Sequence, residues 1–146
     1  METDRKLKKL YAIAARYGMI DTYISYIEYV VQGHSFSAHD LANKIYKAAM
    51  IKREKSIHEH ASGVNDNTEP VAGQMRIAKE FASIYKVMFD YTYYLERLAL
   101  SNKPFDINEA LTRLSDAAIT AYDMKLRGEI DKAIGITLIG GYHDAV

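Results

Sequence analysis

Apolar side chains recur at alternating intervals of four and three residues through most of this chain, and this spacing is typical of helices that bury one face. In the N-terminal part these positions are Ile13, Tyr17, Ile20, Ile24, Ile27 and Val31. In the middle they are Ile77, Phe81, Ile84, Met88, Tyr91, Leu95 and Leu98. The pattern predicts an all-α protein.

The segment from Ile20 to Val31 is rich in Ile, Tyr and Val, residues that favour β-strands. Its polar residues nevertheless recur at intervals of four and three, whereas a strand would repeat them at every second position. These polar residues are Asp21, Ser25, Glu28 and Gln32. We therefore expect one helix over residues 3–32, which Gly33 ends.

Three further helices follow from capping signals. Ser37 with Asp40 forms a variant capping box and predicts a helix over residues 37–61. Thr68 and the first-turn Pro70 predict a helix over residues 68–101. Asp106 with Glu109 predicts a last long helix, which we expect Gly128 to close.

The expected architecture is an elongated antiparallel bundle of about four long helices in a single domain, residues 1–146. Residues 129–146 form a short, glycine-rich tail that we interpret as an extended arm or an edge strand. Phe36-Ser37 and Phe105-Asp106 open the second helix of each hairpin in the same way. Either an ancient duplication or the general need for helix caps explains this similarity.

The composition restricts the class of protein. The chain has 146 residues, 49% hydrophobic and 26% charged, with no formal net charge and no cysteine. Disulfides and thiolate metal sites are therefore excluded. No apolar run approaches the ~20 residues that a membrane span needs, and the N-terminus lacks a signal peptide. We expect a cytoplasmic protein that makes no membrane contact.

Histidine and glycine patterns give no cofactor or metal site. His58 and His60 point to nearly opposite sides of a helix and cannot bind one metal ion there, whereas Glu54 and His58, four residues apart, could. A di-metal bundle would repeat Glu-x-x-His pairs on other helices, and the sequence contains none. No glycine-rich phosphate loop is present. We therefore predict no metal and no cofactor.

Arg53 and His58 fit an Arg-x4-His pattern that resembles the motif of the HEPN family, all-helical proteins of which many are metal-independent ribonucleases. The resemblance implies that the arginine and the histidine act on a scissile phosphate. The sequence departs from the family at Glu54, where Asn, Asp or His is usual. The alternative is that these residues form a solvated polar end of the helix.

The charge map predicts a basic side and an acidic side. Lysines of the second helix fall within one arc of about 140° at 100° per residue, and basic residues of the third lie within about 80° of each other. The basic set is Lys44, Lys47, Lys52, Lys55, Arg76, Lys79 and Lys86. We expect these side chains to contact phosphates, with Tyr46 and Tyr85 stacking on unpaired bases. An ordinary solvated face, or head-to-tail self-assembly, explains the same map.

Residues 68–100 resemble part of the small all-helical subunits of CRISPR effector complexes. The resemblance is carried by a loop, a Gln-aliphatic-Arg step (Gln74-Met75-Arg76) and an aromatic-rich amphipathic run, over about a quarter of the chain. It implies a non-catalytic subunit in antiviral defense, present in several copies and lining a groove for a guide–target duplex or a displaced strand. Arg76 is the one motif position that carries over.

Three hypotheses follow. The first is a non-catalytic, RNA-binding structural subunit that contacts single-stranded nucleic acid or an RNA-containing duplex through phosphates, together with other protein subunits or copies of itself. The second is a HEPN-like ribonuclease that uses Arg53 and His58. The third is a self-assembling helical capsid or filament protein with the tail as its arm.

Overall fold

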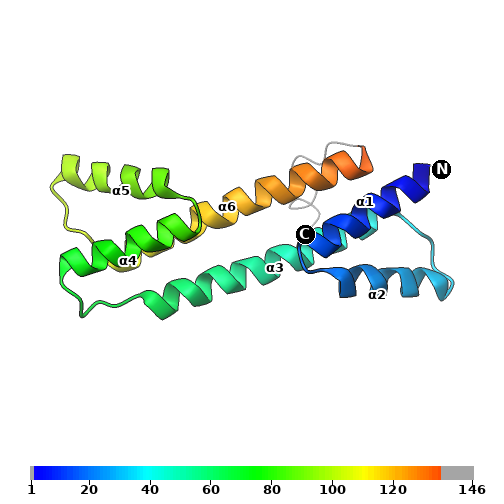
Figure 1. The fold of residues 1–146 in the computed structure, drawn as a ribbon, viewed down its shortest axis with the longest axis horizontal. Coiled ribbons are helices and arrows are strands. Elements are labelled where there is room, and N and C mark those ends of the chain that lie inside the picture. Colours follow the sequence, from blue (N-terminus) through cyan, green and yellow to red (C-terminus); the bar gives the residue numbers. More distant parts are fainter. Residues whose placement is uncertain (1, 136–146) are drawn as a thin grey trace. The chain divides into compact units, whose positions relative to one another are not determined.

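The computed structural model of the protein describes residues 2–135 and confirms the all-α prediction for that range. The described part contains six helices, where the sequence predicted four (Figure 1). They are α1 (Glu2–Arg16), α2 (Ile20–Val31), α3 (Ala38–Val64), α4 (Val71–Ile84), α5 (Met88–Ser101) and α6 (Ile107–Ile134).

The helices form two compact units. Of the described residues, 2–52 and 123–135 belong to unit 1 and 53–122 belong to unit 2. Unit 1 contains the hairpin of α1 and α2 with the first part of α3 and the last part of α6. Unit 2 contains the hairpin of α4 and α5 with the first part of α6 and the last part of α3. Organisation as a single domain stays a prediction.

The two additional helices come from breaks that the periodicity did not reveal. The helix predicted over residues 3–32 is interrupted after Arg16, where Gly18 adopts φ +71°. The helix predicted over residues 68–101 is interrupted after Ile84, where Lys86 adopts φ +58°. Both predictions of one continuous helix were wrong, because a left-handed residue ends a helix without disturbing the apolar spacing on either side.

The C-terminal end of α6 also differs from the prediction. The helix passes through Gly128 and ends at Ile134, so glycine does not close it there. Residues 129–134 are helical and not part of an arm or strand. The rest of the predicted tail, residues 136–146, lies outside the described residues.

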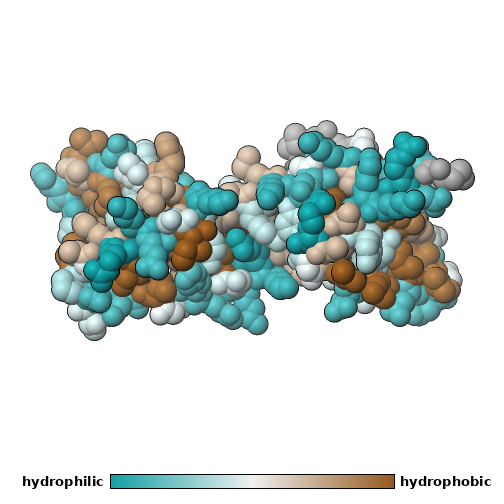
Figure 2. Space-filling model, viewed as in Figure 1, coloured by the Kyte–Doolittle hydropathy of each residue, from teal (hydrophilic) through white to brown (hydrophobic). Residues whose placement is uncertain are grey.

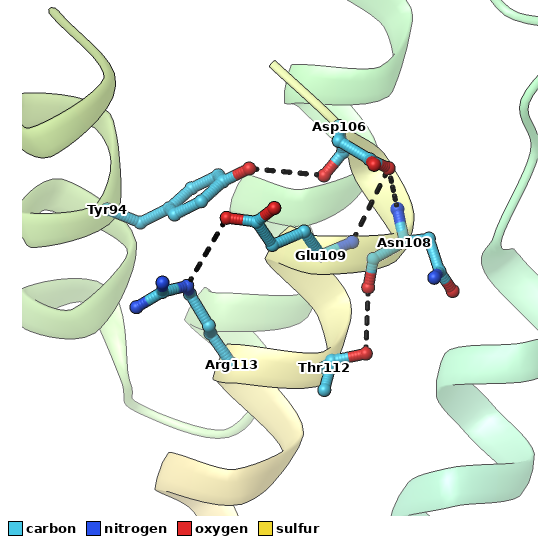
Figure 3. Close-up of polar contacts among 6 residues, drawn as sticks. All are labelled: Tyr94, Asp106, Asn108, Glu109, Thr112 and Arg113. Carbon is cyan, nitrogen blue, oxygen red and sulfur yellow. Dashed lines mark hydrogen bonds and ion pairs between the residues drawn. The ribbon is translucent and has the colours of Figure 1, made fainter. Parts of the chain in front are cut away.

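The predicted N-caps of the two long helices are confirmed. Ser37 Oγ accepts a hydrogen bond from the backbone N–H of Asp40 at 3.2 Å. Asp106 Oδ1 accepts hydrogen bonds from the N–H groups of Asn108 and Glu109 at 2.9 and 3.4 Å (Figure 3). Each cap satisfies donors that a helix N-terminus leaves free.

The two halves of the described chain repeat one pattern, and the two breaks show it most clearly. Tyr17 and Tyr85, 68 residues apart, each donate a backbone hydrogen bond to the carbonyl four residues earlier. Gly18 and Lys86 each donate to the carbonyl three residues earlier, at 3.3 Å. The next residue of each break donates to the carbonyl five residues earlier.

The entry to each long helix repeats as well. The Tyr26 hydroxyl donates to the Ser37 carbonyl at 3.2 Å, and the Tyr94 hydroxyl donates to the Asp106 carbonyl at 3.3 Å (Figure 3). Each tyrosine ring also meets the phenylalanine that precedes the cap, with ring centroids 6.1 and 5.8 Å apart. The similarity of the two helix entries therefore extends to their tertiary contacts.

Several buried positions of α3 and α6 coincide when the two helices are compared at a shift of 69 residues. The equivalent pairs are both buried at Leu41/Ala110, Ala42/Leu111, Ile45/Leu114, Ala49/Ala118 and Ile57/Leu126. The same shift relates His60 to Glu129, which bond to Tyr85 and Tyr17, themselves equivalent residues. Each half thus supplies the side chain that binds the other half's tyrosine.

The two break residues give a matched prediction. We expect Lys86→Gly to raise the free energy of unfolding by about 0.5–1 kcal/mol, because glycine adopts positive φ without steric strain. We expect Gly18→Ala to lower it by about 1–2 kcal/mol for the same reason. Urea denaturation followed by circular dichroism measures both changes. A loss of stability in Lys86→Gly would show that its side chain, and not its backbone, matters.

Candidate functional site

The predicted phosphate-contacting residues are divided between the two units. Lys44, Lys47 and Lys52 lie in unit 1. Lys55, Arg76, Lys79 and Lys86 lie in unit 2. All are exposed except the half-buried Lys47, so their side chains are accessible. The division arises because the second predicted helix passes from one unit to the other after Lys52.

Lys52 stands close to the first break. A Cβ on Gly18 would lie 3.2 Å from Lys52 Nζ, which places the ammonium group against the turn that ends α1. A positive charge near a helix C-terminus is stabilising because the last carbonyls carry partial negative charge. Lys52 thus has a local structural role in addition to its predicted one.

The strongest concentration of basic residues is on α1, which the sequence reasoning passed over. This 15-residue helix contains five basic residues and two acidic ones. Arg5, Lys8 and Lys9 are exposed, whereas Arg16 pairs with Glu129 at 3.3 Å. The closely spaced pairs Arg5-Lys6 and Lys8-Lys9 could have indicated this basic helix from the sequence.

The two units differ in charge. The described residues of unit 1 include 11 lysines and arginines against 8 aspartates and glutamates, a net charge of +3. Unit 2 contains 8 against 10, a net charge of −2. The neutral total therefore conceals a difference in charge between the two units, and the predicted basic and acidic sides stay a prediction.

A groove of about 870 Å³ lies in unit 1 between α2 and α3. Lys44 and Lys47 line it together with Tyr29, whose ring stacks on His34 at 3.9 Å. Asp21 and Asp40 also line it, so cations and carboxylates are balanced within the groove. Tyr29 is exposed and offers a face on which a base can stack.

The stacking roles predicted for two tyrosines were wrong for Tyr46 and are restricted for Tyr85. The Tyr46 ring is 2% exposed in the core of unit 1. Tyr85 is half-buried, with Phe81 4.7 Å from its ring centroid and its hydroxyl 2.7 Å from His60 Nδ1. Both are less exposed than Tyr29, which is 47% exposed.

Tyr46 instead belongs to a polar network with Asp123 and Arg127. Its hydroxyl donates to Asp123 Oδ1, and Arg127 Nη2 donates to the tyrosine oxygen at 3.3 Å and to Asp123 Oδ2 at 3.2 Å. Burial, reinforced by the Asp123 carboxylate, raises the pKa of Tyr46 to about 12. The phenol therefore stays protonated and fixes the carboxylate and the guanidinium in place.

Arg53 and His58 lie in unit 2 in different surroundings. The Arg53 guanidinium lies 4.9 Å from the ring centroid of Tyr122 and 5.4 Å from that of Tyr85. His58 is exposed and lines a different feature, a pocket against α6. Arg53 thus packs between aromatic rings, an arrangement that stabilises a cation.

No protein family, no curated protein and no solved structure matches this chain. Among residues 2–135, no group of three or more histidine, aspartate or glutamate side chains is arranged to hold a metal ion. None of the six described helices combines the length and the apolar character that crossing a membrane requires.

Proposed function

We propose that the protein is a non-catalytic structural subunit of a protein–nucleic acid assembly and that unit 1 contacts the phosphates. The observation that carries the proposal is the excess of basic residues in unit 1, concentrated on the exposed side of α1. Lysine and arginine side chains bind a phosphate backbone irrespective of sequence because they release its counterions. Lys44 and Lys47, which line the groove beside the exposed Tyr29, are further cations of the same unit.

The assembly part of the proposal is supported by three exposed hydrophobic side chains on one side of α5, where the exposed Glu96 also lies. Phe89, Tyr93 and Leu100 follow one another at intervals of four and seven residues and are 81%, 50% and 79% exposed. In Figure 2 brown, hydrophobic residues lie over α5 with teal, hydrophilic residues among them. Exposed apolar patches of this kind mark protein contact sites, and we assign this face to a neighbouring protein subunit or a further copy of the chain.

The resemblance to the small subunits of CRISPR effector complexes agrees with this proposal. By this resemblance, the nucleic acid would be a guide RNA or its target strand. The protein would act in the cytoplasm, in antiviral defense. Arg76, the position that carries over, is exposed on α4.

The test is fluorescence anisotropy of a labelled single-stranded RNA. We expect the variant Arg5→Glu/Lys8→Glu/Lys9→Glu to bind about 100-fold more weakly at 0.1 M salt. The slope of log Kd against log salt should fall by about 2, since each lost contact to a single strand removes ~0.7. The effect should be the same for unrelated RNA sequences, because phosphates carry no sequence information.

The matched control reverses three basic residues of unit 2, in the variant Lys55→Glu/Arg76→Glu/Lys79→Glu. A loss of affinity in this control, with the α1 variant unchanged, would place the interface in unit 2 and contradict the proposal. The RNA recovered from each titration is run on a denaturing gel. RNA cut by the wild type but not by His58→Ala would establish the ribonuclease instead.

A further inference from the structure

A polar pocket of about 230 Å³ lies in unit 2 between the last turns of α3 and the first turns of α6. It is much larger than the roughly 30 Å³ that one water molecule occupies in the liquid. Leu111 and Ser115 are buried, whereas His58, Thr112 and Asp116 are exposed and border its opening. The remaining lining residues are Ala61, Ser62, Asn65 and Asn108.

Two of the residues that line this pocket each carry a buried side-chain oxygen atom without a hydrogen-bond partner among residues 2–135. One is Ser115 Oγ, on a residue that is 2% exposed, and the other is Asn65 Oδ1. The Asn65 amide nitrogen donates to Asn108 Oδ1 at 3.2 Å, which leaves the Asn65 oxygen as an acceptor. A buried polar atom without a partner costs about 1–3 kcal/mol, so native proteins contain few. Two in one pocket indicate a site for a hydrogen-bonding ligand.

The comparison of the two units explains why the pocket exists. Ser115 is the equivalent of Tyr46, 69 residues earlier, and the same shift relates Glu54 and His58 to Asp123 and Arg127. In unit 1 the Tyr46 ring is buried and its hydroxyl is bonded to that acid–base pair. In unit 2 the serine leaves the position of the ring open and its own hydroxyl unpaired. The pocket therefore has room for a planar ring.

We propose that this pocket binds an unpaired nucleobase that carries an amino group next to a ring nitrogen, namely adenine or cytosine. Asn65 Oδ1 would accept a hydrogen bond from the exocyclic amino group. The Ser115 hydroxyl would donate to the ring nitrogen. Leu111 and Ala61 supply apolar contact with the ring.

The charge of the lining agrees with a neutral base. No lysine or arginine lines the pocket, and Asp116 at its rim disfavours a phosphate inside. The sugar and the phosphate must therefore lie outside. The proposal rests on the proposed function only for the strand that would deliver the base, since a free nucleoside tests the pocket by itself.

The experiment is a titration of the ¹⁵N-labelled full-length protein with adenosine, inosine, cytidine and uridine, followed by NMR. We expect saturable shifts at amides of residues 58–65 and 108–116 with adenosine or cytidine. Inosine and uridine present a carbonyl in place of the amino group, and we expect them to bind at least about tenfold more weakly. Equal binding of adenosine and inosine, and of cytidine and uridine, would overturn the assignment, as would the absence of shifts with all four.

Two variants locate the site. Ser115→Tyr restores the ring that unit 1 has at this position and should abolish nucleoside binding, with Glu54 and His58 placed to receive its hydroxyl. Asn65→Leu removes the acceptor and should weaken binding at least about tenfold even if the first variant folds poorly. Unchanged affinity in both variants would contradict the proposal.

The RNA titration and the nucleoside titration test the proposed function and the pocket proposal separately. Loss of RNA binding in the α1 variant concerns the phosphate contacts of unit 1, whereas nucleoside binding concerns unit 2 alone. If RNA binds with the expected salt dependence but no nucleoside binds, the pocket proposal fails and the proposed function stands. If nucleosides bind but RNA does not, the proposed function fails and the pocket proposal stands.

Discussion

Replacing Phe81 with alanine should lower the free energy of unfolding by about 3–5 kcal/mol. Phe81 is 1% exposed and belongs to the apolar cluster of unit 2. Its ring centroid lies 4.7 Å from that of Tyr85 and 5.2 Å from that of His60, so the substitution removes contacts and leaves a cavity. Urea denaturation monitored by circular dichroism measures the loss.

Phe89 provides the matched control, because it carries the same side chain on the same hairpin but is 81% exposed on α5. We expect Phe89→Ala to change the free energy of unfolding by no more than about 0.5 kcal/mol. Similar losses in the two variants would mean that Phe89 is packed in solution or that Phe81 is not.

The core position of Phe81 was predictable, whereas the break that follows it was not. The spacing of apolar residues correctly placed Phe81 and Tyr91 on a buried face. It also included Ile84, which is 55% exposed because the helix ends there. Lys86 adopts positive φ although it is neither glycine nor asparagine, so its residue type carried no signal. At the first break Gly18 was such a signal, and the regular spacing around it masked it.

Local interactions were predicted better than tertiary ones. The caps at Ser37 and Asp106 depend on side chains and backbone groups a few residues apart, so the sequence contains all their determinants. The division into units depends on which parts of α3 and α6 pack with each hairpin. Periodicity within one helix does not contain that information, so the sequence did not predict that the basic residues belong to two units.

The candidate sites show the same limit. Tyr46 lies at helical spacing from Ala42 and Ala49, and all three residues are buried. The spacing of these residues in the sequence could therefore have predicted the burial of Tyr46. Tyr46 and Ser115 are separated by the same 69 residues as Phe36-Ser37 and Phe105-Asp106, but only the structure shows that this shift extends along α3 and α6. Phe36-Ser37 and Phe105-Asp106 suggested a repeat, but only the recurring breaks, tyrosine contacts and buried positions extend it through both halves.

The repeat leads to a second large effect. The variant Tyr46→Ser places at position 46 the residue found at the equivalent position, Ser115. We expect it to lower the free energy of unfolding by about 3–5 kcal/mol, as for the loss of a buried aromatic ring. Asp123 and Arg127 would also lose the phenol that bonds them. Tyr46→Phe separates the contributions, because it keeps the ring and removes only the hydroxyl, for a loss of about 1 kcal/mol. Denaturation of both variants measures the difference, and Ser115→Tyr should show no comparable loss.

If Tyr46→Ser were no less stable than Tyr46→Phe, the ring would contribute little to packing. The pocket of unit 2 could then not be attributed to the absence of that ring.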